Sequence, residues 1–299
     1  MRESGVTNIV AANRRPRTFF ITDADLLHIQ FSSKAHPCNI AGMPKTTEAH
    51  REKLSENGPF QQLKMGSAKG LLFEDGLCWA VAMDETSITL KGVNLGASVV
   101  VPRKASGLVI FAHGSGSSRH SPRNQYVAGV LREAGLGTLL FDLLTAEEER
   151  AEAYMRHLRF DIPFLAERLV GVTRWALERM KTNEVNVGYF GSSTGAAAAL
   201  VAAAELREII GAVVSRGGRP DLAGDALEQV KAPTLLIVGG EDREVITLNQ
   251  EAYGRLHCEK AMRIVAGASH LFEEPGTLED VAEIATEWFA QHLQQSVSS

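Results

Sequence analysis

The sequence is poor in cysteine and has no apolar run long enough to cross a bilayer. Its 299 residues include three cysteines, Cys38, Cys78 and Cys258, which form neither a C-x-x-C pair nor a Cys/His metal spacing. We therefore expect no disulfide framework and no metal site. No apolar segment reaches the about 18 residues of a membrane span, and the first residues lack the apolar stretch of a secretory signal. These absences predict a cytoplasmic protein with reduced thiols and no membrane partner.

An excess of positive charge is also missing. Lys and Arg number 31 against 36 Asp and Glu, which gives a formal net charge of −5, and the basic residues form no stripe. Proteins that bind nucleic acid usually show such an excess, so we expect no nucleic-acid partner. Apolar residues make up 44% of the chain and charged residues 22%, which is enough to build a globular core.

Residues 1–85 differ from the rest of the chain in their pattern of apolar and polar residues. They mix short apolar pairs with polar stretches, show no clear period, and change character at Met43. We interpret them as an N-terminal extension, either a partly flexible leader or docking arm, or in part an over-extended reading frame whose native start is Met43. No chemistry is assigned to them. Residues 86–299 form the second predicted domain.

From residue 86 onwards, short apolar runs alternate with helix-like stretches. Two β-branched segments, residues 86–95 and 97–101, come first and are expected to be strands. The later apolar runs are residues 107–112, 137–141, 185–190, 209–214, 233–238 and 261–265. The helix-like stretches are residues 122–135, 162–181, 194–206, 222–230, 246–257 and 277–294. Wholly apolar strands that alternate with helices predict an α/β fold with a doubly wound, mostly parallel sheet.

A G-x-S-x-G pentapeptide, residues 191–195, joins an expected strand to an alanine-rich helix and places Ser193 at its centre. A nucleophilic serine needs a tight turn that exposes its hydroxyl, and side chains at the two glycine positions would collide with the strand and the helix. The pentapeptide alone is weak evidence, and a simple connecting loop is the alternative. Ser192 is a competing hydroxyl, but its position should face away from the cleft.

A serine hydroxyl becomes a good nucleophile only when a histidine accepts its proton. Three histidines follow Ser193: His257, His270 and His292. His257 and His292 fall within expected helices among polar neighbours. His270 follows the last expected strand. In α/β folds with a nucleophilic serine, the chain order is serine, then acid, then histidine, and the histidine base follows the last strand. It is therefore the predicted base.

The acid that orients the histidine should follow the preceding strand. Gly239 and Gly240 end that strand, and Glu241 and Asp242 come next, at the carboxyl edge of the sheet. We favour Asp242 over Glu241 because of its position in the turn. Asp142 is a rival at another strand end, and a role as a helix cap or loop partner suits it better.

The loop after residues 107–112 reads His-Gly-Ser-Gly-Ser-Ser-Arg and is the candidate oxyanion hole. The backbone N–H of Ser115, beside that of Thr194, is expected to bind the negative oxygen of a tetrahedral intermediate. The Gly-Ser-Gly sequence also opens a dinucleotide-binding motif. Arg119 occupies the third glycine position of that motif, however, and no acidic residue ends a strand about 20 residues later.

The serine, the acid and the histidine occur in this order along the chain, and residues 86–296 resemble the dienelactone-hydrolase-like branch of the α/β-hydrolase superfamily. The passages that carry the resemblance are HGSGSSRHSPRNQ, FDLLTAEEE, GYFGSSTGAAAAL, SRGGRPDL, TLLIVGGEDREV and GASHLFEEPGTLE. The resemblance implies an α/β-hydrolase-type sheet, hydrolysis by Ser193, Asp242 and His270, and no metal or organic cofactor. Dienelactone hydrolases proper use a cysteine nucleophile, so Ser193 weakens the expectation of a dienelactone substrate. Some relatives carry a phosphoribosyltransferase domain, which residues 1–85 do not resemble.

The expected function is a serine esterase that acts on small, soluble acyl esters. The short stretch 215–221 leaves no room for a large lid, although residues 143–161 could cover part of the cleft. Arg119 and Arg216 fall at the carboxyl edge of the sheet and are candidate contacts for an anionic substrate group, with ion pairing or solvation as the alternative. Lactone, dienelactone or C–C cleavage on the same triad, and a non-catalytic ligand-binding protein, are the other candidate functions.

Overall fold

The computed structural model describes residues 84–103, 105–155, 157–180 and 186–293. The predictions for the N-terminal extension and for Met43 therefore lie outside the described residues. None of the helices in the described part of the chain is long and apolar enough to cross a membrane.

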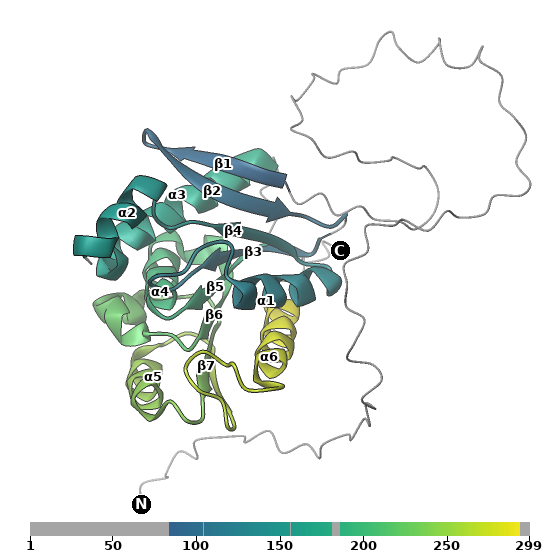
Figure 1. Ribbon diagram of the computed structural model, residues 1–299. Helices are drawn as coiled ribbons and strands as arrows, with labels where there is room; N and C mark the ends of the chain where they lie inside the picture. The colour runs from purple at the N-terminus through teal and green to yellow at the C-terminus, as the bar shows by residue number, and fades with distance from the viewer. Residues whose placement is uncertain (1–83, 104, 156, 181–185, 294–299) are drawn as a thin grey trace, which may run out of the picture. The chain divides into compact units, whose positions relative to one another are not determined.

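An eight-stranded sheet in the order β1-β2-β4-β3-β5-β6-β7-β8 forms the centre of the fold (Figure 1). Its strands are β1 (Asp84–Leu90), β2 (Val93–Val100), β3 (Gly107–Ala112), β4 (Gly137–Phe141), β5 (Asn186–Ser192), β6 (Ile210–Arg216), β7 (Thr234–Gly239) and β8 (Lys260–Val265). β2 pairs antiparallel with β1 and with β4, and every other pair is parallel. The predicted mostly parallel sheet is confirmed.

The parallel strands are apolar because helices cover both faces of the sheet. Every residue of β3, β4 and β7 is buried. A strand with one face in water would instead alternate between apolar and polar residues. Parallel strands share the direction of their carboxyl ends, so the loops that follow β3, β5, β6, β7 and β8 open onto the same edge of the sheet.

Two layers of helices enclose the sheet (Figure 1). One layer is α1 (Pro122–Glu133) and α6 (Thr277–His292), whose apolar residues pack in one core cluster. The other consists of α3 (Ile162–Met180), α4 (Thr194–Leu206) and α5 (Arg243–Arg255), together with the 3₁₀ helix η5 (Pro220–Gln229). The alanines of α4 are buried, which lets this helix lie close to the sheet.

The structure corrects three details of the sequence prediction. Residues 86–95 do not form one strand, because Lys91 and Gly92 both take positive φ values (45° and 87°) and turn the chain into a β1–β2 hairpin. The expected helix at residues 222–230 is the 3₁₀ helix η5, which is interrupted at Gly224 with φ 55°. Helix α2 (Ala146–Met155) was not predicted, because its Tyr154 and Met155 are exposed and it has no apolar stripe.

A buried hydroxyl pair links the sheet to α3 and gives a first prediction. The Tyr189 hydroxyl of β5 and Thr173 Oγ1 lie 2.6 Å apart, and both residues are fully buried. Because one buried hydrogen bond is lost, Tyr189→Phe should lower the free energy of unfolding by about 1 kcal/mol in urea denaturation. Tyr126→Phe on the exposed side of α1 is the control and should have no effect. Equal stability of Tyr189→Phe and wild type would contradict this assignment.

Candidate active site

Ser193 occupies the sharp turn between β5 and α4. Its backbone angles are φ 50° and ψ −124°, outside the regions that residues other than glycine commonly adopt. Such strain persists only where the surrounding structure enforces it, and it is concentrated at functional sites. The serine of a nucleophile elbow takes this kind of strained turn between a strand and a helix.

The two glycines of the pentapeptide are required by packing. A Cβ on Gly195 would lie 2.2 Å from the carbonyl oxygen of Ala112 in β3, and a Cβ on Gly191 would lie 2.5 Å from the Cα of Ala196. Any side chain at these positions would push α4 away from the sheet. The turn geometry at Ser193 therefore depends on both glycines.

His270 and Asp242 are hydrogen-bonded to each other. The distance from His270 Nδ1 to Asp242 Oδ2 is 2.6 Å, and the imidazole is 40% exposed against 15% for the carboxylate. Asp242 is the N-cap residue of α5, yet its side chain does not cap that helix. An aspartate at this position normally accepts a backbone N–H of the first turn, so its carboxylate is committed to the histidine instead.

The segment after β6 brings the serine and histidine loops together. The N–H of Arg219 donates to the Ser193 carbonyl oxygen at 3.1 Å. A Cβ on Gly217 would lie 3.7 Å from Cε1 of His270 and 3.0 Å from its carbonyl oxygen. In the described residues, the ring is hydrogen-bonded to Asp242 and not to the Ser193 hydroxyl.

Ser115 and Thr194, the predicted oxyanion pair, are in contact. The backbone N–H of Ser115 donates to Thr194 Oγ1 at 3.1 Å. Gly114 places this loop against the elbow, since a Cβ there would lie 3.0 Å from Cβ of Ser193. The arrangement directs the Ser115 N–H toward the start of α4.

His113 fixes the orientation of that N–H, a role that the sequence reasoning missed. Its Nε2 accepts the Leu143 N–H at 3.0 Å, so the proton is on Nδ1, which donates to the Gly114 carbonyl oxygen at 2.9 Å. Burial lowers the pKa of His113 and favours this neutral form. The C=O and N–H of a trans peptide point in opposite directions, so holding the Gly114 oxygen turns the Ser115 N–H toward Thr194.

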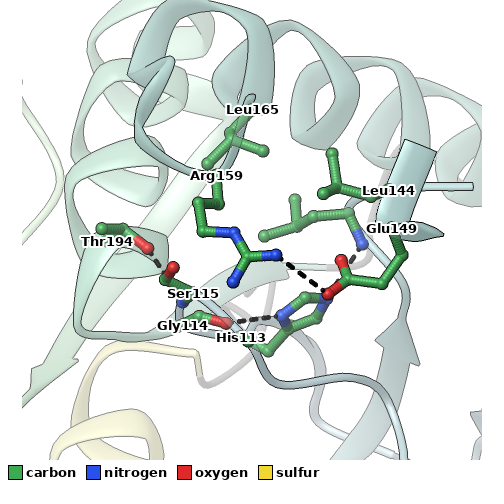
Figure 2. Close-up of a pocket in the computed structure, with 10 residues that line it drawn as sticks. His113, Gly114, Ser115, Leu144, Glu149, Arg159, Leu165 and Thr194 are labelled. Atoms are coloured by element: carbon green, nitrogen blue, oxygen red, sulfur yellow. Dashed lines mark hydrogen bonds and ion pairs between the residues drawn. The ribbon is translucent and has the colours of Figure 1, made fainter. Parts of the chain in front are cut away.

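A small hollow, about 230 Å³ when the space open to solvent is included, lies beside this loop (Figure 2). Its walls combine the loop after β3, the segment after β4 and the first residues of α3 and α4. The lining residues are His113, Gly114, Ser115, Gly116, Leu143, Leu144, Glu149, Arg159, Leu165 and Thr194. Part of the wall comes from residues 143–161, the segment that the sequence suggested as a partial cover.

The charged side of the hollow is built around a buried carboxylate. Glu152 of α2 accepts the backbone N–H groups of residues 157–159 at 3.0–3.1 Å, and the Arg159 Nε at 3.2 Å. Burial opposes ionisation of Glu152, but the N–H groups of Leu158, Arg159 and His157 and the guanidinium outweigh it and lower its pKa to about 2. Figure 2 shows the Arg159 guanidinium between the loop after β3 and Glu149, to which it is paired at 3.4 Å.

The two arginines predicted as substrate contacts do not line this hollow. The Arg119 guanidinium binds Asp142 and, at 2.9 Å, Glu85. Asp142 is thus a loop partner of Arg119. Arg216 is 6% exposed and lies on the face of the sheet covered by α1. In the described residues, no group of three or more His, Cys, Asp and Glu side chains is placed to hold a metal ion.

Comparison with known proteins identifies the family. The model of the dienelactone hydrolase family matches residues 95–294. The chain belongs to the dienelactone hydrolase family. A dienelactone hydrolase from Anabaena variabilis is 58% identical, with a TM-score of 0.69 over 71% of this chain and 98% of that one.

Other similar proteins extend the comparison. A protein of Mycobacterium tuberculosis named as a candidate phosphoribosyl transferase is 57% identical over 210 residues, which are 70% of this chain and 46% of the relative. The chain thus spans about half the length of this relative. Est1E from Butyrivibrio proteoclasticus is 18% identical, with a TM-score of 0.59 over 70% of this chain and 98% of that one, and it shows a shared fold.

The close packing at Gly195 gives a testable prediction. Gly195→Ala should lower the free energy of unfolding by at least about 2 kcal/mol, because the new methyl group overlaps the Ala112 carbonyl. Gly254→Ala in α5 is the matched control: a Cβ there meets nothing within 4 Å, and stability should stay equal or rise by up to about 1 kcal/mol. Urea unfolding followed by circular dichroism measures both. If Gly195→Ala is as stable as the wild type, α4 can shift away from the sheet and the prediction is wrong.

The buried Glu152 predicts a specific pH dependence. Its pKa is lowered from 4.5 to about 2, so its charged form stabilises the fold above pH 4.5, and this contribution is lost as the pH falls from 4.5 toward 2. Glu152→Gln should be less stable than wild type at neutral pH, and the difference should shrink below pH 4.5. Urea unfolding at a series of pH values measures it. Glu147→Gln, at an exposed surface pair, should show almost no difference throughout. A Glu152→Gln difference that stays constant down to pH 2 contradicts the assignment.

Proposed function

We propose that the protein is a serine hydrolase that cleaves small carboxylic esters through an acyl-enzyme intermediate. The observation that carries the proposal is the 2.6 Å bond between His270 and Asp242, at the same sheet edge as the strained turn of Ser193. A nucleophile, an acid and a base in this chain order form the catalytic group of the α/β-hydrolase fold. Membership of the dienelactone hydrolase family supports hydrolysis as the reaction class.

The hydrogen bond to Asp242 determines which nitrogen of His270 acts. With Nδ1 donating to the carboxylate, Nε2 is the nitrogen available to accept the Ser193 proton. After rotation of its side chain toward the ring, Ser193 Oγ attacks the ester carbon and its proton moves to Nε2. The carbon–oxygen bond to the alcohol then breaks, and the alcohol leaves with that proton. Water, deprotonated by His270, attacks the acyl-enzyme, and the acid is released as Ser193 regains its proton.

The negative oxygen of each tetrahedral intermediate is assigned to the N–H groups of Ser115 and Thr194. In the structure, Thr194 Oγ1 accepts the Ser115 N–H, so the substrate oxygen must replace that hydroxyl. The bond from His113 to Gly114 keeps the Ser115 N–H in place during this exchange. One such donor typically contributes about 3 kcal/mol of transition-state stabilisation.

The hollow beside the proposed oxyanion site supports a small acyl group. It is narrow and partly open to solvent, with walls close to the loop that carries Ser115. Leu143, Leu144 and Leu165 form the apolar side, and Arg159 and Glu149 form the polar side. We infer a preference for a short acyl chain, because a long chain would extend beyond these walls. The substrate contacts predicted for Arg119 and Arg216 are not part of this proposal.

A lactone is the second candidate substrate. The 58% identical protein from Anabaena variabilis carries the name dienelactone hydrolase, and a lactone is a cyclic ester that the same steps would open. Open-chain esters and lactones need differently shaped pockets but the same catalytic triad. A lactone therefore belongs in the experiment that tests the proposed function.

Replacing Ser193 tests the mechanism. Ser193→Ala should reduce kcat on p-nitrophenyl acetate at least about a thousandfold while the protein stays folded, because the attacking oxygen is lost. Ser192→Ala, which changes the neighbouring serine, should keep activity. Among p-nitrophenyl acetate, butyrate and decanoate, kcat/KM should be lowest for decanoate, and dihydrocoumarin reports lactone opening. Wild-type turnover by Ser193→Ala, or loss of turnover in Ser192→Ala alone, would overturn the assignment of the nucleophile.

A further inference from the structure

Arg216 is a buried arginine without an acidic partner in the described part of the chain. It is the last residue of β6, pairs in register with Ser192 of β5 and Ile237 of β7, and is 6% exposed. Its Nη2 donates to Asn124 Oδ1 at 3.4 Å, and its Nε has no partner. Burial, together with the nearby Arg123, lowers the pKa of Arg216 to about 10, so the group is still charged at neutral pH. A buried charge held by one long hydrogen bond is unfavourable for stability, which points to another role.

The Arg216 guanidinium contacts an aromatic ring of the histidine loop. Its central carbon lies 5.7 Å from the centroid of Phe272, within the range of a cation–π interaction. Phe272 is 1% exposed and takes φ 57°, a left-handed conformation that is rare for a bulky residue. It lies two residues after His270. The packing of this ring thus holds the loop in a conformation that its backbone would otherwise avoid.

Two further contacts hold the same loop. Arg123, in the first turn of α1, pairs with Glu273 at 2.9 Å, and Glu274 accepts the Ser269 N–H at 3.0 Å. The first turn of α1 also carries Asn124, the hydrogen-bond partner of Arg216. One helix end therefore contacts the loop directly through Glu273 and indirectly through Arg216.

We propose that Arg216, through its cation–π contact with Phe272, is a positioning residue that holds the His270 ring in line with Asp242 and Ser193. This inference rests on the proposed function, since it concerns the base of that reaction. It gives Arg216 a different role from the substrate contact expected from the sequence, because the guanidinium is buried and does not line the hollow. Arg216 acts through Phe272 and touches no reacting atom.

Removing either member of the Arg216–Phe272 pair tests the inference. In the full chain, Arg216→Met should lower kcat on p-nitrophenyl acetate about 10- to 100-fold with KM within about twofold, because the base is misplaced while the acyl hollow is intact. Phe272→Leu, which keeps an apolar side chain, should do the same. The double variant should be little worse than either single one, since both act through one contact. Independent, multiplicative losses would overturn the proposed route through Phe272.

The control is Arg132→Met, at the end of α1 far from Asn124. Arg132 is half-buried and donates to Thr138 Oγ1 at 3.2 Å, away from the histidine loop. It should lower stability without lowering kcat. An equal loss of kcat in this control, or wild-type kcat in folded Arg216→Met, overturns the inference. If Arg216→Met does not fold, wild-type kcat in Phe272→Leu overturns it.

A spectroscopic measurement separates this inference from the proposed function. The proton between His270 Nδ1 and Asp242 should give a far-downfield NMR signal in wild type and should broaden or disappear in Arg216→Met but not in Arg132→Met. If wild type hydrolyses no ester or lactone, the proposed function fails, while this signal still reports on the loop. If wild type is active and the signal is unchanged in Arg216→Met, only the positioning role fails.

Discussion

The contact between α4 and β3 at Gly195 is the constraint on which the rest of the site depends. With hydrogen as its side chain, this residue lets the helix start against the carbonyl oxygens of Ala112 and His113. The close approach enforces the positive φ of Ser193 and places Thr194 within hydrogen-bond distance of Ser115. The geometry of the serine turn and that of the proposed oxyanion site therefore have one steric origin.

Several polar side chains near this contact bind loop groups and not the partners that such residues usually have. Asp242 begins α5 but binds His270 instead of capping its helix. His113 is buried and neutral, and uses both ring nitrogens to hold backbone groups. Glu152 is ionised in the interior because backbone N–H groups surround it. Each arrangement reduces the freedom of a loop at the carboxyl edge of the sheet, where a parallel α/β fold leaves its loops to bind ligands.

Much of the fold was predictable because buried parallel strands are wholly apolar. The bounds of β3 and β4 match the expected runs, and Ser193, Asp242 and His270 lie on the loops where strand order placed them. Their catalytic roles are still predictions. The features that were missed depend on contacts between distant segments. Helix α2 has no apolar stripe, the burial of Glu152 depends on a turn that follows its helix, and the burial of Arg216 depends on the packing of α1 and Phe272.

The arrangement around Glu152 has a consequence for how this protein can diverge. The carboxylate binds residues 157–159 of its own segment, so much of the wall of the hollow that carries Arg159 is held by local contacts and not by the strands. Substitutions between α2 and α3 can reshape this hollow while the serine turn and the Asp242–His270 pair stay as they are. Under the proposed function, selectivity and turnover would be encoded in separate stretches of sequence, so the substrate could change while the residues of the reaction stay the same.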